Sequence, residues 1–497
     1  MKRIVSLLLV FCLLAALTGA SGEEALGEVV EAPEALPVTT RHSIEIEGQT
    51  LDYTAAAGRM KLEVDGSACE MFYIAYTLDG VEDLKERPVT FAFNGGPGSS
   101  SEWLHLGMLG PRRVDVDEDG QPRSLPARLV DNPYSILDLT DLVFIDPVGT
   151  GYSRAAEGVD PAPFYTYSGD IASVSEFIRK YVAQNGRWGS EKYVVGESYG
   201  TIRAAGVTKY LSENYDMGLN GVMLVSSVND MLTLSEGSLN DLACALYLPS
   251  YAAIGWYHGL LDEKYQSMPL KAYLEEVSAY AGGAYQQALF KGVTLTDEER
   301  NAVAGQIADY TGLKTDVVLS CGLRIGIPDF CGNLLKDKNM MVGRLDGRYT
   351  GPITKGDIGS GDSDPSSNAL SSAFGSAINH YLADELDYHT DLSYVTLSLD
   401  VNGRWTYELD NQTLDQKEDI YNAMSRNQYL KWWVLGGYYD LATPYYAAEW
   451  VYNHVFLNAE TRKNLTFTLY PSGHMIYMHE PSLARFHQEA TAWYRGE

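Results

Sequence analysis

The chain has 497 residues, with 66 acidic side chains against 37 lysines and arginines, and its formal net charge is −29. Hydrophobic residues make up 45% and charged residues 21%, a composition typical of globular proteins that excludes fibrous and disordered chains. The acidic excess argues against nucleic-acid binding, which needs a basic face, and against electrostatic binding to anionic lipid. Enzymes that act on neutral or weakly charged substrates remain compatible with this charge.

The N-terminal segment, residues 1–20, has the pattern of an export signal. Lys2 and Arg3 supply the positive start, residues 4–17 are apolar, and residues 18–20 are small enough for a cleavage site. A membrane anchor is the alternative, but the apolar run is shorter than the roughly 20 residues that span a bilayer. No later stretch is long and apolar enough to span a membrane. The sequence therefore predicts an exported protein, secreted or periplasmic, with no stable membrane span after cleavage.

The next part of the chain changes from a polar segment to an alternation of strands and helices. Residues 21–40 are acidic and proline-bearing, which predicts a flexible tether. Between residues 42 and 78, alternating apolar and polar side chains predict antiparallel strands. Short apolar runs then alternate with helix-like stretches: VTFAF, DLVFI, KYVVG, GVMLV, KWWVLGG and LTFTL. Such runs are typical of buried parallel strands, so we expect an α/β fold with a mostly parallel central sheet flanked by helices.

Two amphipathic segments predict helices that flank this sheet. Residues 170–184 carry apolar side chains at helical spacing, with Ser168 and Asp170 as candidate N-terminal caps. Residues 481–494 show the same periodicity, with Pro481 near the first turn.

The alternation stops between about residues 231 and 410, a helix-like and tyrosine-rich stretch. We expect an insertion that covers the carboxyl edge of the sheet, with a mobile loop at GDIGSGDSDPSS near residues 356–367. The predicted organisation is a signal peptide at 1–20, a tether at 21–40, the first part of the core at 41–230, a helical cap at 231–410 and the second part of the core at 411–497.

Four cysteines follow the predicted signal, at positions 69, 244, 321 and 331. An even number in an exported chain permits two disulfides, and Cys321 with Cys331 is the simplest local pair. Buried free thiols are the alternative, because four cysteines are few for a chain of this length. Neither paired C-x-x-C spacing nor an H-E-x-x-H pattern is present, so we expect no metal and no other cofactor.

The sequence G-E-S-Y-G at residues 196–200 follows an apolar run and precedes a predicted helix. This is the strand–turn–helix context of a nucleophile elbow, whose sharp turn needs glycines to keep side chains clear of the backbone. In a chain with 47 glycines the pattern alone has little weight, and its context gives it meaning. Ser198 is the candidate nucleophile.

The other parts of a hydrolase site occur in the chain order Ser, acid, His, each just after an apolar run. Asp440 follows KWWVLGGYY and could orient an imidazole, and His474 follows LTFTLYPSG. Upstream, N-G-G-P-G at residues 94–98 follows VTFAF, where backbone N–H groups could face an oxyanion. The non-catalytic alternatives are a tight turn at residues 94–98 and a surface histidine at 474. The occurrence of all these elements in the expected order favours a catalytic site.

These stretches resemble those of the serine carboxypeptidase family of α/β-hydrolases. The chain looks like a bacterial-type member of that family. The similarity lies in FNGGPGSSS at residues 93–101, DPVGTGYS at 146–153, GESYG at 196–200, GGYYDLATP at 436–444 and GHMIYMHEP at 473–481. The resemblance implies an α/β-hydrolase fold with an inserted helical cap and a peptidase that hydrolyses its substrates near the C-terminus.

The resemblance also implies a role for each site residue. Ser198 would attack the carbonyl, His474 would act as general base and acid, and Asp440 would hold the imidazole. The backbone N–H groups of Gly96 and Tyr199 would bind the oxyanion.

The group that binds the substrate's terminal carboxylate in the family departs from the pattern here. Asn94 and Glu197 are kept, whereas Ala92 stands at the position of a tryptophan and Met108 at that of a second glutamate. Paired carboxyl groups share protons and favour acidic operation. With one of them absent, we expect weaker carboxylate recognition, or recognition by another group, and activity nearer neutral pH.

The sequence therefore predicts an exported serine carboxypeptidase with peptide substrates and no nucleic-acid partner, and it does not predict an oligomeric state. An esterase or acyltransferase that uses the same triad is one alternative. A non-catalytic binding protein on the same fold is another, since fold does not fix function.

Overall fold

The computed structural model describes residues 36–234, 240–353, 364–407, 409 and 412–496. The predicted export signal and most of the predicted tether lie outside these residues. No helix in the described part of the chain is long and apolar enough to cross a membrane.

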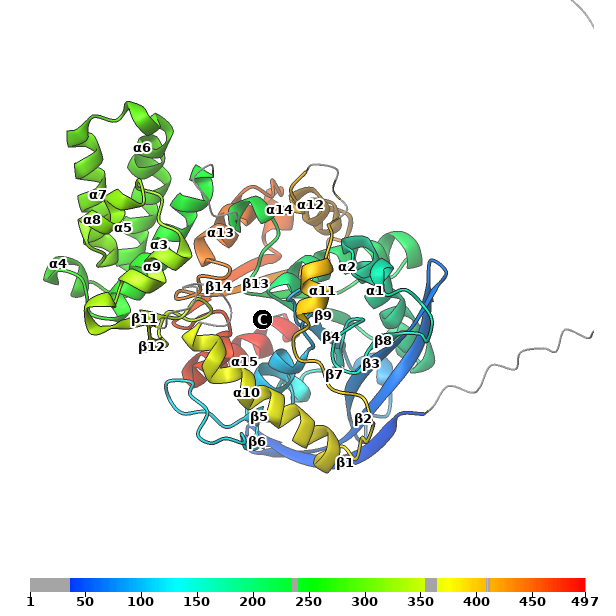
Figure 1. The fold of residues 1–497 in the computed structure, drawn as a ribbon. Helices are drawn as coiled ribbons and strands as arrows, with labels where there is room; N and C mark the ends of the chain where they lie inside the picture. The colour runs from blue at the N-terminus through cyan, green and yellow to red at the C-terminus, as the bar shows by residue number, and fades with distance from the viewer. Residues whose placement is uncertain (1–35, 235–239, 354–363, 408, 410–411, 497) are drawn as a thin grey trace, which may run out of the picture. The chain divides into compact units, whose positions relative to one another are not determined.

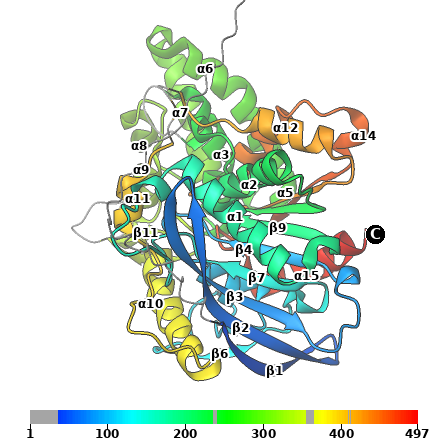
Figure 2. The same cartoon turned by 90° about the vertical axis from the view of Figure 1, so that its right-hand side faces the viewer.

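The described strands include one ten-stranded sheet, ordered β1-β2-β3-β7-β4-β9-β10-β13-β14, with β8 paired to β3. The antiparallel strands β1 to β3 lie at one edge, and Figure 2 shows β1 and β2 in blue along it. From β7 to β14 all neighbouring strands are parallel. The strand bounds are β1 Val38–Ile46, β2 Gln49–Val64, β3 Ser67–Leu78, β4 Val89–Phe93, β5 Arg112–Val114, β6 Leu129–Asp131, β7 Asp141–Ile145, β8 Arg154–Ala155, β9 Lys192–Glu197, β10 Gly221–Val225, β11 Met340–Val342, β12 Thr350–Pro352, β13 Lys431–Gly437 and β14 Leu465–Tyr470.

The six apolar runs of the sequence form the parallel part of the sheet, which confirms the predicted α/β architecture. Every residue of β4, β7, β9 and β10 is buried, as expected for strands covered on both faces. Their registers place the carboxyl ends of β4 and β9 side by side, with Phe93 opposite Gly196. Loops that follow these strands therefore meet at one edge of the sheet.

Helices cover both faces of the sheet (Figures 1 and 2). Side chains from α1, α2, α12 and α13 share one core with the strands, and side chains from α10 and α15 belong to a second core. The helix bounds are α1 Tyr167–Gln184, α2 Tyr199–Tyr215, α3 Asp241–Tyr257, α4 Glu263–Gln266, α5 Leu270–Tyr280, α6 Gln286–Lys291, α7 Asp297–Thr311, α8 Thr315–Ser320, α9 Ile327–Asn333, α10 Pro365–His380, α11 Leu399–Arg404, α12 Lys417–Arg426, α13 Tyr445–Asn453, α14 Ala459–Arg462 and α15 Glu480–Arg495.

Both predicted flanking helices are present, with one correction. Helix α1 begins at Tyr167, and its cap is Thr166, whose hydroxyl accepts a hydrogen bond from the Gly169 N–H. The predicted caps Ser168 and Asp170 lie inside the first turn instead. Helix α15 carries Pro481 in its first turn, where the missing N–H of proline costs no hydrogen bond.

The stretch predicted as one insertion lies between β10 and β13, two strands that pair directly. Helices α3 and α5 to α9 enclose a core of their own, and Figure 1 shows α10 and α11 apart from this group. Residues 395 and 397 bridge to Gly151 and Ser99, in the loops that follow β7 and β4. This part of the stretch therefore lies against the carboxyl ends of the parallel strands.

Three local expectations are wrong. Residues 38–40, assigned to the tether, belong to β1 and pair with residues 55–57 of β2. The last residues of the expected loop, 365–367, form the first turn of α10, capped by the Asp364 side chain, while residues 354–363 lie outside the described part. Cys321 carries a free thiol, so the expected bridge to Cys331 is not formed.

One buried carboxyl group has no hydrogen-bond partner among the described residues. Glu102 is 0% exposed, and neither of its carboxyl oxygens is bonded. Burial raises its pKa well above the ordinary value, and the nearby charge of Asp146 raises it further. The pKa of Asp146 is itself raised by burial, to about 7. The folded chain therefore keeps the Glu102 proton to a higher pH than the unfolded chain does.

This proton makes the stability of the fold depend on pH. Above the ordinary glutamate pKa of about 4.3, the unfolded chain releases the proton while the folded chain keeps it, so the free energy of unfolding falls as pH rises. We expect Glu102→Gln to flatten this fall between about pH 5 and pH 8, measured by urea denaturation. The exposed Glu118→Gln is the control and should keep the wild-type slope. Equal slopes in all three proteins would contradict the assignment.

Candidate active site

Ser198 lies on a sharp turn between β9 and α2. Its backbone has φ 60° and ψ −129°, a conformation that costs a residue with a side chain about 1–3 kcal/mol. The flanking glycines permit this turn, because a Cβ at Gly196 would lie 2.0 Å from the Gly200 carbonyl oxygen. The strain and the close packing support the predicted nucleophile elbow, since they point the Ser198 side chain out of the sheet edge.

The turn after β4 packs directly against this elbow. A Cβ on Gly95 would lie 2.4 Å from the Tyr199 backbone nitrogen, so only glycine fits there. Gly96 has φ +101°, which again favours glycine, and its peptide bond to Pro97 is cis. Tyr199 is the first residue of α2, so its N–H has no acceptor within the helix. The two predicted oxyanion donors, Gly96 and Tyr199, both line the pocket that contains Ser198.

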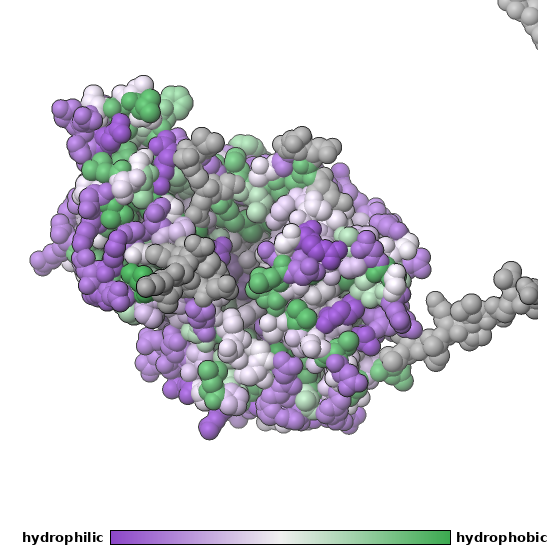
Figure 3. Space-filling model, in the orientation of Figure 1, coloured by the Kyte–Doolittle hydropathy of each residue, from purple (hydrophilic) through white to green (hydrophobic). Residues whose placement is uncertain are grey.

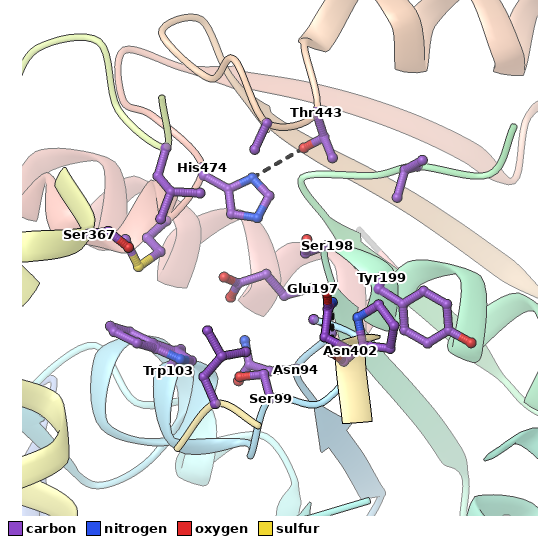
Figure 4. Close-up of a pocket in the computed structure, with 18 of the residues that line it drawn as sticks. Asn94, Ser99, Trp103, Glu197, Ser198, Tyr199, Ser367, Asn402, Thr443 and His474 are labelled. Carbon is purple, nitrogen blue, oxygen red and sulfur yellow. Dashed lines mark hydrogen bonds between the residues drawn. The ribbon is translucent and has the colours of Figure 1, made fainter. Parts of the chain in front are cut away.

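Asp440 and His474 come together from the loops after β13 and β14. The His474 Nδ1 lies 2.8 Å from Asp440 Oδ2, and both residues are buried. The other carboxylate oxygen, Oδ1, accepts the backbone N–H groups of Ala442 and Thr443 at 2.7 and 3.0 Å. The carboxylate is therefore fixed from both sides, and the His474 ring lies beside Ser198 in Figure 4.

Thr443 belongs to this arrangement and was missed by the sequence reasoning. Its hydroxyl lies 2.8 Å from Asp440 Oδ2, 3.2 Å from His474 Nδ1 and 3.0 Å from the Ser226 carbonyl oxygen. Figure 4 draws the contact with His474 as a dashed line. The Ser226 hydroxyl in turn donates to the His474 carbonyl at 2.6 Å. The sequence indicated this role only by placing Thr443 three residues after Asp440, in L-A-T-P at 441–444. Such closeness in sequence does not predict a side-chain contact.

The pKa of the His474 imidazole is raised above its ordinary value by its neighbours. Burial lowers this pKa, but the charge and hydrogen bond of Asp440, together with the charge of Glu197, outweigh burial. The positive charge of Arg344 acts in the opposite direction. The ring is thus a base whose proton affinity depends on the carboxylate behind it.

The pocket in front of Ser198 has a volume of about 500 Å³. Figure 3 shows a hollow in the face that carries α11, with hydrophobic residues beside it. Leu397 and Leu399 line the pocket and are 52% and 72% exposed. Apolar side chains also line it from the elbow side and from α10: Ile202, Val228, Met231, Leu234, Leu345, Leu370 and Met475. Trp103, which the sequence reasoning also missed, faces Glu197 across the pocket (Figure 4).

Asn94 and Glu197 lie together on the pocket wall below His474 (Figure 4). Their side chains are hydrogen-bonded to each other, and both are buried. Behind them the Tyr477 hydroxyl donates to the two Glu197 oxygens at 3.2 and 3.0 Å. The Tyr477 ring occupies space that Gly107 leaves open, since a Cβ there would lie 2.3 Å from the ring. Tyr477 therefore holds the Glu197 carboxyl group in place.

Burial raises the pKa of Glu197 to about 7, against the opposing effects of the His474 charge and of the hydrogen bonds from Tyr477 and Asn94. The carboxyl group therefore changes its charge near neutral pH. As a neutral acid, Glu197 can donate a hydrogen bond to an anion in the pocket, whereas its ionised form repels one.

Ala92 and Met108, which replace the tryptophan and the second glutamate of the family pattern, are both fully buried. Neither is among the residues that line the pocket. The part of the pocket around Glu197 accordingly lacks the second carboxyl group.

A buried ion pair ties the two turns of the site to the core. Arg203 on α2 is bonded through Nε to both carboxylate oxygens of Asp170, at 2.9 and 2.8 Å. Its Nη1 also donates to the carbonyl oxygen of Asn94. Arg203 thus joins the helix after the nucleophile to the turn after β4, and it lies over the Tyr199 ring at 5.3 Å. Within the described residues, no group of His, Cys, Asp and Glu side chains is arranged to hold a metal ion.

Sequence comparison agrees with this geometry. A family model described as serine carboxypeptidase matches residues 47–476. The chain belongs to the serine carboxypeptidase family.

Relatives within this family are distant. Serine carboxypeptidase-like 15 of Arabidopsis thaliana is 32% identical over 149 residues, which are 29% of this chain and 33% of that protein. Carboxypeptidase Y homolog A of Uncinocarpus reesii is 26% identical over 196 residues, 39% of this chain and 32% of that protein. The chain thus spans about a third of the length of these family members.

A solved structure extends the similarity over most of the fold. Kex1(delta)p, a prohormone-processing carboxypeptidase from Saccharomyces cerevisiae, superposes with a TM-score of 0.57 and 16% identity. The superposition covers 89% of this chain and 91% of the other. This similarity shows that the chain has the same fold as that carboxypeptidase, the α/β-hydrolase fold.

The contact between Tyr477 and Glu197 can be tested by removing the hydroxyl alone. Tyr477→Phe keeps the ring against Gly107 but loses a hydrogen bond to the charged carboxylate, so the pKa of Glu197 should rise further, by about half a unit to one unit. We expect the pH at which the KM of free-acid peptides increases to move upward by the same amount.

The matched control is Tyr470→Phe, which removes a hydroxyl 2.6 Å from Glu489, away from the pocket. Its KM profile should equal that of the wild type. A Tyr477→Phe profile that does not move would mean that the hydroxyl does not act on Glu197.

Proposed function

We propose that the protein is a serine carboxypeptidase, which hydrolyses peptides near the C-terminus through an acyl-enzyme on Ser198. The observation that carries this proposal is the arrangement of one pocket. The strained Ser198, His474 and the Asn94–Glu197 pair all lie on its wall, and Asp440 is bonded to His474 from behind. The triad supplies nucleophilic catalysis, and the Asn94–Glu197 pair supplies polar groups for a terminal carboxylate.

The chemistry follows from the proton positions. His474 Nδ1–H donates to Asp440, which leaves Nε2 free to take the proton of the Ser198 hydroxyl as the oxygen attacks the peptide carbonyl. His474 then gives this proton to the leaving amine, and the acyl group remains on Ser198. In the second half of the reaction, His474 takes a proton from water as the water oxygen attacks the acyl carbonyl. The imidazolium then returns this proton to the Ser198 oxygen, and the acid leaves. Asp440 stabilises the imidazolium and fixes its tautomer.

The negative oxygen of the tetrahedral intermediate would lie between the N–H groups of Gly96 and Tyr199. Removal of one such donor typically reduces turnover about a hundredfold or more. The close packing of Gly95 on the Tyr199 nitrogen supports this role, because it holds the two turns at a fixed separation.

We also propose that the protein is exported, as the N-terminal pattern of residues 1–20 predicts. N-terminal sequencing of protein recovered from the medium or the periplasm should find these residues removed. Recovery of the uncleaved chain from a membrane fraction would support the anchor interpretation instead.

Single substitutions in the triad test the assignment of roles. Ser198→Ala should reduce kcat on the order of 10⁶-fold, and Asp440→Asn about 10⁴-fold, because the asparagine stabilises the wrong tautomer of His474. A fluorophosphonate should label the wild type and fail to label Ser198→Ala. An active Ser198→Ala protein would overturn the nucleophile assignment, and an unlabelled wild type would favour the binding-protein alternative.

The substrate class is tested by blocking the carboxylate. N-blocked dipeptides with a free C-terminus should be hydrolysed far faster, in kcat/KM, than the same dipeptides with an amidated C-terminus. Equal rates on the two would exclude carboxypeptidase activity and favour the esterase or acyltransferase alternative.

Activity should depend on pH through two groups. As pH rises through the raised pKa of His474, the ring loses its proton and kcat increases. As pH rises past about 7, Glu197 ionises and repels the substrate carboxylate, so KM increases. A neutral ester substrate should show the first change only, and Glu197→Gln should abolish the second. Steady-state kinetics between about pH 5 and pH 9 would measure both. A KM for free-acid peptides that is constant above pH 7 would contradict the role of Glu197.

A further inference from the structure

Among the described residues that line the pocket, Arg344 is the one lysine or arginine. This residue lies in the turn after β11 and is exposed. Its guanidinium group forms no hydrogen bond or ion pair with any other described residue. Arg348, four positions along, differs: its side chain is bonded to both Asp346 oxygens. Within the described part of the chain, Arg344 is thus a cation in the pocket without a bonded partner.

The backbone of Arg344 is fixed to the catalytic loops on both sides. Its carbonyl accepts the N–H of Leu441, next to Asp440, at 3.0 Å. The adjacent Leu345 carbonyl accepts the N–H of His474 at 2.7 Å. The backbone of the arginine is therefore held by Leu441 and His474, in the loops that carry the acid and the base, and its charge is close enough to lower the pKa of the His474 imidazole.

The carboxylate that contacts the backbone of this turn, Asp364, is already hydrogen-bonded. Its oxygens accept the backbone N–H groups of Arg344 and Leu345 at 2.9 and 3.3 Å, and the N–H and hydroxyl of Ser366 at 3.1 and 2.6 Å. Asp364 thereby caps α10 and holds the Arg344 turn against it. Among the described residues, the Asp364 carboxylate therefore bonds to the backbone and to Ser366, and not to the Arg344 guanidinium.

These contacts place Arg344 on the leaving-group side of the pocket. Asp364 joins its turn to the start of α10, which carries Ser367. In Figure 4, Ser367 and Trp103 lie on the side toward which the Glu197 carboxyl group points, away from Tyr199. If the protein is the carboxypeptidase proposed above, the C-terminal residue of the substrate occupies this side.

We propose that Arg344 binds a carboxylate of the substrate's C-terminal residue and is a specificity-determining residue of this site. A substrate anion meets a strongly acidic protein and Glu197, which ionises near neutral pH, so a local cation would offset this repulsion and add to the hydrogen bonds of Asn94 and Glu197. The carboxylate is either the terminal one or that of an acidic side chain, because the guanidinium recognises both in the same way.

The binding step can be separated from catalysis. Ser198→Ala protein binds an N-blocked dipeptide without cleaving it, so calorimetry measures the affinity directly. We expect the peptide ending in free leucine to bind more tightly than its amide. Adding Arg344→Gln should reduce the ratio of the two affinities about tenfold and leave the affinity of the amide unchanged. If Arg344→Gln leaves unchanged the affinities of both free peptides, the one ending in leucine and the one ending in glutamate, the proposal is overturned.

Peptides that end in glutamate distinguish the two carboxylates. Equal losses of affinity for peptides ending in leucine and in glutamate would assign Arg344 to the terminal carboxylate. A loss confined to the glutamate peptide would assign it to the acidic side chain. Either result supports carboxylate binding.

The matched control is Arg426→Gln, which removes the same charge from an exposed arginine outside this pocket, paired with Glu213 at 3.0 Å. It should leave all affinities unchanged, and a loss equal to that of Arg344→Gln would mean that only the long-range field matters and would overturn the proposal. Loss of the Arg344 charge should raise the pKa of His474, so fluorophosphonate labelling of Arg344→Gln, with Ser198 intact, should reach the wild-type rate once the pH is high enough to leave the ring neutral in both proteins. If the wild type hydrolyses no peptide, the proposed function is rejected but the role of Arg344 is not, because the binding measurement does not require hydrolysis.

Discussion

The site depends on the direct contact between two backbone turns, the one after β4 and the one at Ser198. No side chain separates them, because a Cβ on Gly95 would overlap the Tyr199 nitrogen. This contact holds the backbones of two distant segments against each other, and Arg203 secures it from behind by bonding to the Asn94 carbonyl. The glycines are therefore required by packing as well as by backbone conformation.

Much of the fold could be predicted because buried parallel strands consist of continuous apolar runs, and six such runs became six strands. The errors lie where pairing or capping is decided by distant residues. Residues 38–40 resemble a polar tail until they pair with β2. The start of α10 follows a stretch rich in glycine and serine, and only the cap at Asp364 marks it. Cysteine spacing suggested a bridge, although spacing does not specify geometry.

The candidate triad could be predicted because its residues follow strands whose carboxyl ends meet at one edge. The residues that tune the site could not be found in this way. Tyr477 matters because it meets Glu197 and the gap at Gly107, which are far from it in the sequence. Arg344 is one of many charged residues in the insertion, where the sequence shows no alternation of strands and helices that would place it at the site. Its significance arises from what its neighbour Asp364 already binds.

The order of the strands has a consequence for biosynthesis. Strands β10 and β13 are neighbours, yet the whole of residues 226–430 lies between them, and Asp440 and His474 follow later still. A nascent chain therefore exposes its serine turn long before it contains the acid and the base. Until translation is almost complete, the proposed catalytic residues cannot come together.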